Sequence, residues 1–190
     1  MDCGALDKNS HSLYETVMGE SFDRLAPAVR EFHRLSGRVH LYGEVQVDPP
    51  VTFVAKILSF CLGASTVRSV GALHFELDAA PHEEIWIRRF PNHAMSSRLC
   101  FDADGVVEKL GAATLVFGLV EEDGMLKMIL RRMAFWGIPC PARLLPDIVA
   151  EERGVGRQIH FNVAASIPIF GLVTRYRGYL DLSTAKMMVS

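Results

Sequence analysis

Trp86, Arg88 and Phe90 are the residues best suited to binding chemistry in this chain. They alternate along one apolar segment, so in a β-strand they share a face. An arginine between aromatic residues can point outward, with its stem lying over the rings. Alternatively it points inward at the end of an apolar cavity, where its fork of donors meets a carboxylate or phosphate. We expect Arg88 to contact a ligand, unless an internal carboxylate such as Glu76 pairs with it.

Three further residues complete the candidate ligand-binding set. Arg175 and Tyr176 follow each other in a predicted strand, so they lie on opposite faces. His33 stands near the end of a predicted helix. It either caps that helix or bonds a carbonyl, or it lies at the mouth of a pocket, because histidine donates, accepts or titrates near neutrality.

Catalytic and metal-binding patterns are weak. No two of the seven histidines lie at i, i+2 or i, i+4 spacing, and the four cysteines are scattered, so we expect no metal and no cofactor. No serine or cysteine stands in a nucleophile-elbow context. The charge cluster 151–153 is predicted to form a short helical or solvated turn. No catalytic residue can therefore be assigned.

Composition limits the classes of partner. The 190 residues carry 20 basic and 22 acidic side chains, a balance that predicts no nucleic-acid binding. The longest uncharged stretch, 158–174, alternates as a strand does, so we expect no stable membrane insertion. Scattered cysteines and an N-terminus without a signal-peptide pattern favour a cytoplasmic protein. The sequence does not indicate an oligomeric state.

The first third of the chain is predicted to be mostly helical. Ser12 and Glu15 fit a capping box at the start of a helix that falters at Gly19. A second helix is expected from Pro27 to about residue 36. After a strand at 39–47, residues 51–62 carry one charge and apolar side chains all round. This segment predicts a buried helix, or one that caps an apolar cavity.

From residue 72 onward the pattern predicts strands joined by hairpins. Asp104-Gly105 and Asp123-Gly124 are strong hairpin signals, and long strands are expected at 125–135, 158–167 and 172–182. Three prolines make 137–146 irregular. The predicted class is α+β: a strongly curved antiparallel β-sheet or barrel-like cup of about eight strands, with two N-terminal helices and one apolar helix after the first strand. We expect residues 1–11 to be a disordered N-terminus and 12–190 to form a single domain.

Several segments together resemble a bacterial family catalogued as domain of unknown function 4166. The resemblance runs from about residue 13 to 182 and includes Glu84–Phe90, Phe135–Pro139 and Arg175–Gly178. Its most specific pieces, taken together, are the W-x-R-x-F pattern at 86–90 and the R-Y-x-G pattern at 175–178. Some members of that family are joined to saccharopine-dehydrogenase-like nucleotide-binding domains. The resemblance implies a bacterial cytoplasmic domain and brings no reaction with it.

The expected function is a binding module for a hydrophobic or amphipathic anionic small molecule held in the β-cup. Two alternatives remain open at this point. One is a small enzyme, of isomerase or hydrolase type, that uses a polar group in the cup. The other is an accessory or regulatory domain for an oxidoreductase, which only the family's fusions suggest.

Overall fold

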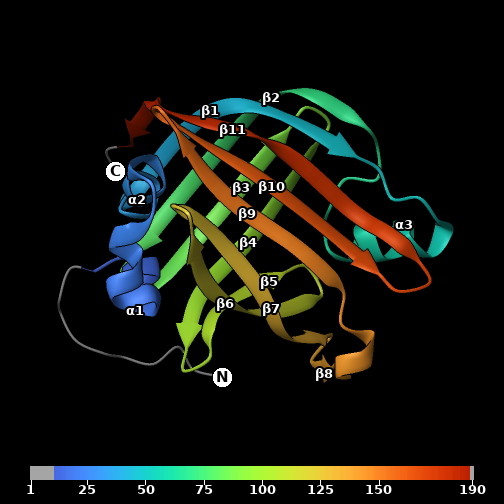
Figure 1. Cartoon of the computed structure of the whole chain (residues 1–190). Helices are drawn as coiled ribbons and strands as arrows, with labels where there is room; N and C mark the ends of the chain where they lie inside the picture. The colour runs from blue at the N-terminus through green and yellow to red at the C-terminus, as the bar shows by residue number, and fades with distance from the viewer. Residues whose placement is uncertain (1–10, 189–190) are drawn as a thin grey trace.

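The computed structural model describes residues 11–188, most of which belong to one antiparallel β-sheet. Pairing of β6 with β7 closes ten strands into a barrel, and the short β8 extends β7 outside the ring (Figure 1). The strands are β1 (Gly37–Asp48), β2 (Ser69–Ala80), β3 (Glu83–Phe90), β4 (His93–Asp102), β5 (Gly105–Leu110), β6 (Ala113–Glu122), β7 (Met125–Phe135), β8 (Ile138–Pro139), β9 (Asp147–Val155), β10 (Gln158–Ile167) and β11 (Gly171–Met187).

The antiparallel barrel class is confirmed, but the expected count of about eight strands is wrong. β5 and β6 are joined by the two-residue turn Gly111-Ala112, which carries no proline, Asn or Asp signal. The prediction of a helical or solvated turn for the charge cluster at 151–153 is wrong. These residues belong to strand β9, all of which pairs with β10. Pairing with β10 therefore determines the conformation of β9, although the local charge pattern favours a turn.

The N-terminal helices cover one end of the barrel (Figure 1). They are α1 (Leu13–Met18), the 3₁₀ segment η1 (Gly19–Arg24) and α2 (Pro27–His33). The predicted capping box is present: Ser12 Oγ accepts from the Glu15 amide at 3.2 Å, and the Glu15 carboxylate accepts from the Ser12 amide at 2.9 Å. Apolar side chains of these helices, including Leu13, Phe22 and Phe32, are buried in the main core. The predicted N-terminal segment 1–11 lies, apart from His11, outside the described residues.

The predicted apolar helix exists as α3 (Phe53–Cys61), at the opposite end of the barrel (Figure 1). Of the two alternatives for this segment, the buried helix is wrong, because only Ala55 and Ser59 of the helix are buried. The alternative, a helix over an apolar cavity, agrees with its place at the barrel end, where Leu62 just after it lines the cavity. Its start is fixed by Thr52, whose hydroxyl accepts from the Ala55 amide at 3.2 Å. The two ends of the barrel are thus covered differently, one by buried helices and one by a largely exposed helix.

Strand alternation decides which side chains face the interior. On β3, Glu84, Trp86, Arg88 and Phe90 are buried, while the residues between them are partly or fully exposed. Every second side chain of β3 therefore points into the barrel, and two of these side chains, Glu84 and Arg88, are ionisable.

Candidate functional site

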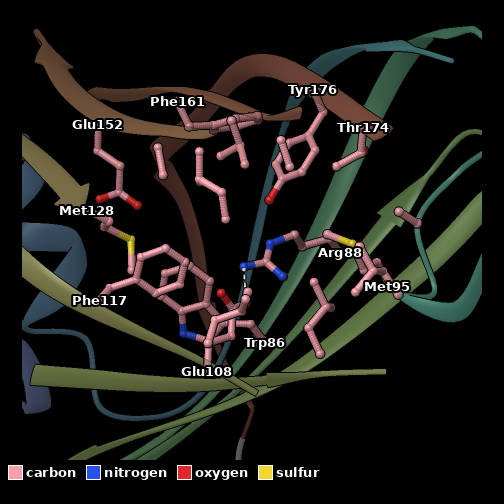
Figure 2. A pocket seen from close by; sticks show the side chains of 18 of the residues that line it. Trp86, Arg88, Met95, Glu108, Phe117, Met128, Glu152, Phe161, Thr174 and Tyr176 are labelled. Atoms are coloured by element: carbon pink, nitrogen blue, oxygen red, sulfur yellow. Dashed lines mark ion pairs between the residues drawn. The ribbon is translucent and has the colours of Figure 1, made fainter. Parts of the chain in front are cut away.

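A cavity of about 130 Å³ lies inside the barrel (Figure 2). Most of its wall is apolar and comes from strands all round the ring, because each strand turns every second side chain inward. This lining includes Phe75, Phe90, Met95, Leu99, Phe117 and Phe161. The polar side chains that reach it include Tyr14, Arg88, Glu108, Glu152, Thr174 and Tyr176.

Arg88 points from β3 into this cavity (Figure 2). Its Nη1 donates a hydrogen bond to Ser97 Oγ on β4 at 3.0 Å, and its Nη2 lies 3.6 Å from Glu108 Oε1 on β5. The guanidinium carbon lies 4.9 Å from the centre of the Trp86 ring, which adds a cation–π contact. Of the two orientations that the sequence left open, the structure has the inward one.

Glu76 is not the carboxylate that meets Arg88. Phe75 lies directly opposite Arg88 in the β2–β3 register, so Phe75 shares the inward face and Glu76 points outward. There Glu76 forms an ion pair with the exposed Arg89. Glu108 takes the interior position because it alternates with Lys109 on β5 and faces the same side as Leu110.

Trp86 is 6% exposed, so its indole ring is shielded from solvent. Its Nε1 donates to the Glu84 carboxylate at 2.7 Å. Burial raises the pKa of Glu84, while His33 and the Trp86 hydrogen bond act in the opposite direction. Glu84 is therefore a buried carboxyl group that takes up a proton more readily than an exposed glutamate does.

Tyr176 and Phe90 lie together in the cavity wall, whereas Arg175 does not reach it. The two rings have centroids 5.6 Å apart, and the hydroxyl end of Tyr176 points towards Arg88 (Figure 2). Burial raises the pKa of the Tyr176 hydroxyl, and the nearby Arg88 charge opposes that rise. Arg175 is exposed on the outer face of β11, as its alternation with Tyr176 requires.

Two hydroxyl groups in the cavity wall are buried without a hydrogen-bond partner among residues 11–188: Tyr14 Oη and Thr174 Oγ1. Burial, and then the charge of Glu152, raise the pKa of Tyr14 well above its ordinary value, so Tyr14 stays a neutral donor. Buried polar atoms of this kind are normally paired, by protein, water or ligand. Both hydroxyls are available to a polar group inside the cavity.

His33 lies behind the cavity wall and not at a pocket mouth. Its ring is fully enclosed and packs against the Tyr14 ring in a tilted arrangement, with ring centroids 3.7 Å apart. Its Nε2 lies 2.7 Å from Glu152 Oε2, so it meets a carboxylate of β9 instead of a backbone carbonyl. His33 is therefore separated from the cavity by residues of its wall, which include Tyr14 and Glu152.

The cavity residues that sequence reasoning missed include Tyr14, Thr174 and two carboxylates, Glu108 and Glu152. Their signal is alternation: Ile148, Ala150 and Glu152 lie on one face of β9, and all three line the cavity. A charged residue that follows two inward apolar positions at a spacing of two is a candidate interior group. In the described part of the chain, no three His, Cys, Asp or Glu side chains are grouped so that they could hold a metal ion.

Comparison with known proteins assigns the chain to a family. The family model described as domain of unknown function (DUF4166) matches residues 25–180, so the chain belongs to this family. No curated protein matches the chain. Among solved structures, the crystal structure of Rv2717c from M. tuberculosis is similar with a TM-score of 0.41 and 11% identity, over 83% of this chain and 98% of that one. Within residues 11–188, the structure has no helix of the length and apolar character needed to cross a membrane.

Proposed function

We propose that this protein binds a hydrophobic or amphipathic small molecule inside its barrel, with the ligand's polar head at Arg88. The observation that carries the proposal is a guanidinium aimed into an apolar cavity. A charged group in such surroundings is costly unless polar partners satisfy it. Cytoplasmic location remains part of this proposal.

The partners of Arg88 leave donor capacity for a ligand. A guanidinium has five N–H donors. Among residues 11–188 it makes one hydrogen bond, to Ser97, and the 3.6 Å separation from Glu108 is longer than a hydrogen bond. An anionic or strongly accepting head group can use the remaining donors. The unpartnered hydroxyls of Tyr14 and Thr174 supply further polar contacts.

The size of the cavity narrows the class of ligand. Clefts that bury drug-sized ligands enclose roughly 300–1,000 Å³. This cavity, of about 130 Å³, is smaller, so a short or narrow molecule fits without rearrangement of the wall. A medium-length alkyl chain with one polar head has that shape.

The test compares octanoate with 1-octanol by titration calorimetry, since the two differ only in the charged head. In Arg88→Met/Glu108→Leu we expect octanoate affinity to fall by at least about tenfold, as for loss of a hydrogen bond to a charged group. Octanol affinity should change little. Removing both charges avoids leaving Glu108 buried without its partner.

The matched control is Arg89→Met, on the same strand but exposed on the outer face. It should bind both probes as the unaltered protein does. Equal affinity for the two probes would contradict the anionic head, and binding of neither would contradict the hydrophobic cavity as a ligand site. Native mass spectrometry of the purified protein provides a parallel search for a co-purified compound.

The contact between Glu152 and His33 favours a second candidate, a small acid–base enzyme. The Glu152 carboxylate faces the cavity (Figure 2). The neutral Tyr14 hydroxyl belongs to the same cavity wall, so the cavity is lined by a base and by a hydrogen-bond donor. Such a pair suits proton abstraction and return, as in an isomerisation. The test is to incubate any compound extracted from the protein with Glu152→Gln and with the unaltered chain, and to look for isomer formation by chromatography.

A further inference from the structure

The large apolar side chains of α3 point away from the barrel. Phe53 and Phe60 are 78% and 80% exposed, whereas the helix buries Ala55 and Ser59 completely. A surface helix that packs for stability normally turns its large apolar residues inward. In α3 the small residues face the protein, so packing among residues 11–188 does not account for its outer face.

This outer face is held in a fixed place across the end of the barrel. Before the helix, the Thr52 hydroxyl donates to the carbonyl of Phe170 at 2.9 Å, in the turn between β10 and β11. At the other end, the carbonyl of Cys61 accepts from the Ala112 amide at 3.0 Å, in the turn between β5 and β6. Both ends of α3 are therefore anchored to strand turns, and the exposed side chains form a defined surface.

Neighbouring segments extend the apolar surface. Ile169 in the β10–β11 turn is 97% exposed, and the segment after α3 adds a further exposed valine. Exposed apolar side chains that gather in one area mark interaction sites, whereas single ones are ordinary. We call this surface the α3 face; its members are Val51, Phe53, Ile57, Phe60, Val67 and Ile169.

The charges around the α3 face are mostly of one sign. Residues 49–70 and 163–175 contain Lys56, Arg68 and Arg175 and no Asp or Glu. Asp48 borders these segments, where it lies opposite Arg175 in the β1–β11 register and 3.5 Å from Arg68. The surface is therefore apolar and aromatic with a positive surplus.

We propose that the α3 face docks on the surface of a bilayer that contains anionic lipids. Apolar and aromatic side chains enter the boundary between head groups and acyl chains, and basic side chains near the surface are attracted to anionic lipids. A second copy fits less well, because a two-fold interface sets the same patch against itself and brings Lys56 and Arg68 near their own copies. The docking is peripheral and needs no spanning segment.

The cavity reaches towards the same end of the barrel. Leu62 and Ala64, which follow α3 directly, belong to its lining. Docking through the α3 face therefore places this end of the cavity close to the lipid. The docking proposal stands on surface residues and does not depend on which molecule the cavity binds.

The test is flotation of the full chain with vesicles of phosphatidylcholine alone and of phosphatidylcholine with phosphatidylserine. We expect binding to the mixed vesicles that weakens with added salt. Lys56→Gln should lower it about fivefold, the effect of one basic residue near an anionic surface. Phe53→Ser/Phe60→Ser should reduce it to background while the thermal melt stays unchanged, because both side chains are exposed.

The matched control is Ile129→Ser/Val155→Ser, which removes two side chains of about half exposure outside the α3 face. It should bind as the unaltered chain does. Equal binding to both vesicle types, or binding that survives Phe53→Ser/Phe60→Ser, would overturn the proposal. A dimer in light scattering that Phe53→Ser/Phe60→Ser dissociates, without vesicle binding, would assign the α3 face to a second copy instead.

Discussion

His33 Nε2 and Glu152 Oε2 lie 2.7 Å apart, although 119 residues separate them in the chain. The contact joins the last residue of α2 to the inner face of β9 and so fastens the N-terminal helices to the barrel. His33 also packs against the Tyr14 ring, so His33, Glu152 and Tyr14 form one buried group. This group forms one side of the site.

Replacing His33 by Leu should lower the free energy of unfolding by about 3–5 kcal/mol, because the Glu152 carboxylate is then buried without its partner. Urea denaturation measures the change. His33→Leu/Glu152→Leu should lose less than His33→Leu alone, since no unpaired carboxylate remains. An equal or larger loss in the double variant would show that packing, and not the contact, sets the cost.

Trp86→Ala should lower the free energy of unfolding by about 3–5 kcal/mol, the usual cost of removing a large aromatic side chain from a core. The indole contacts Phe75 and Tyr14 and donates to Glu84, so several contacts are lost together. Trp136→Ala is the matched control, since Trp136 is exposed and should change stability by less than about 0.5 kcal/mol. Similar losses in the two variants would contradict the assignment of Trp86 to the core.

Tyr14→Phe should raise the free energy of unfolding of the ligand-free protein by about 1 kcal/mol. An unpaired buried hydroxyl costs about 1–3 kcal/mol, and the variant removes that group while keeping the ring. The melt is measured after denaturing extraction and refolding, so that no bound compound contributes. A clear loss of stability would mean that the hydroxyl has a partner in the folded protein.

Glu84→Gln should gain stability relative to the unaltered protein as pH rises. Burial raises the folded-state pKa of Glu84 above its ordinary value of 4.5, so the folded protein holds this proton more tightly than the unfolded chain. The resulting stabilisation is complete below the unfolded pKa and is lost as pH rises through the folded pKa. Gln keeps an acceptor for Trp86 and does not titrate.

The measurement for Glu84→Gln is urea denaturation of both proteins at several values between about pH 4 and pH 8. The difference in unfolding free energy should grow in favour of the variant across this range. Other carboxylates have lowered pKa values, as Glu76 does beside Arg89, and their contribution to stability changes with pH in the opposite direction. That contribution is the same in both proteins, so it cancels in the difference between their unfolding free energies. A difference that is flat with pH would contradict a raised pKa at Glu84.

Several features of this protein follow from local sequence. The Ser12–Glu15 capping box, the hairpin turns and the antiparallel class depend on residues that are close in the chain, so their signals are local. Asp123 and Gly124 both adopt positive φ, as a tight hairpin turn between β6 and β7 requires. Alternation likewise indicated that Trp86, Arg88 and Phe90 share one face.

Alternation fixes which residues share a face but not which of the two faces is inside. Arg88 is inside because its strand pairs with β2 and β4, whose apolar sides also face inward. The same register turns Glu76 outward and leaves Glu108, two strands away, as the interior carboxylate. Residue spacing in the sequence does not predict that Arg88 meets Glu108, because their strands are brought together by the sheet pairing.

Closure of the barrel and the direction of α3 were also decided by tertiary structure. β6 pairs with β7, and β7 with β9, so the chain closes on itself and brings Glu152 to His33. The apolar composition of α3 predicts burial. In the structure only the face with the small residues Ala55 and Ser59 packs against the end of the barrel. The sequence determined the elements and the alternation of their faces, because those depend on neighbours in the chain. The partners across the cavity depend on strand register and space around the ring, which exist only once the barrel is closed.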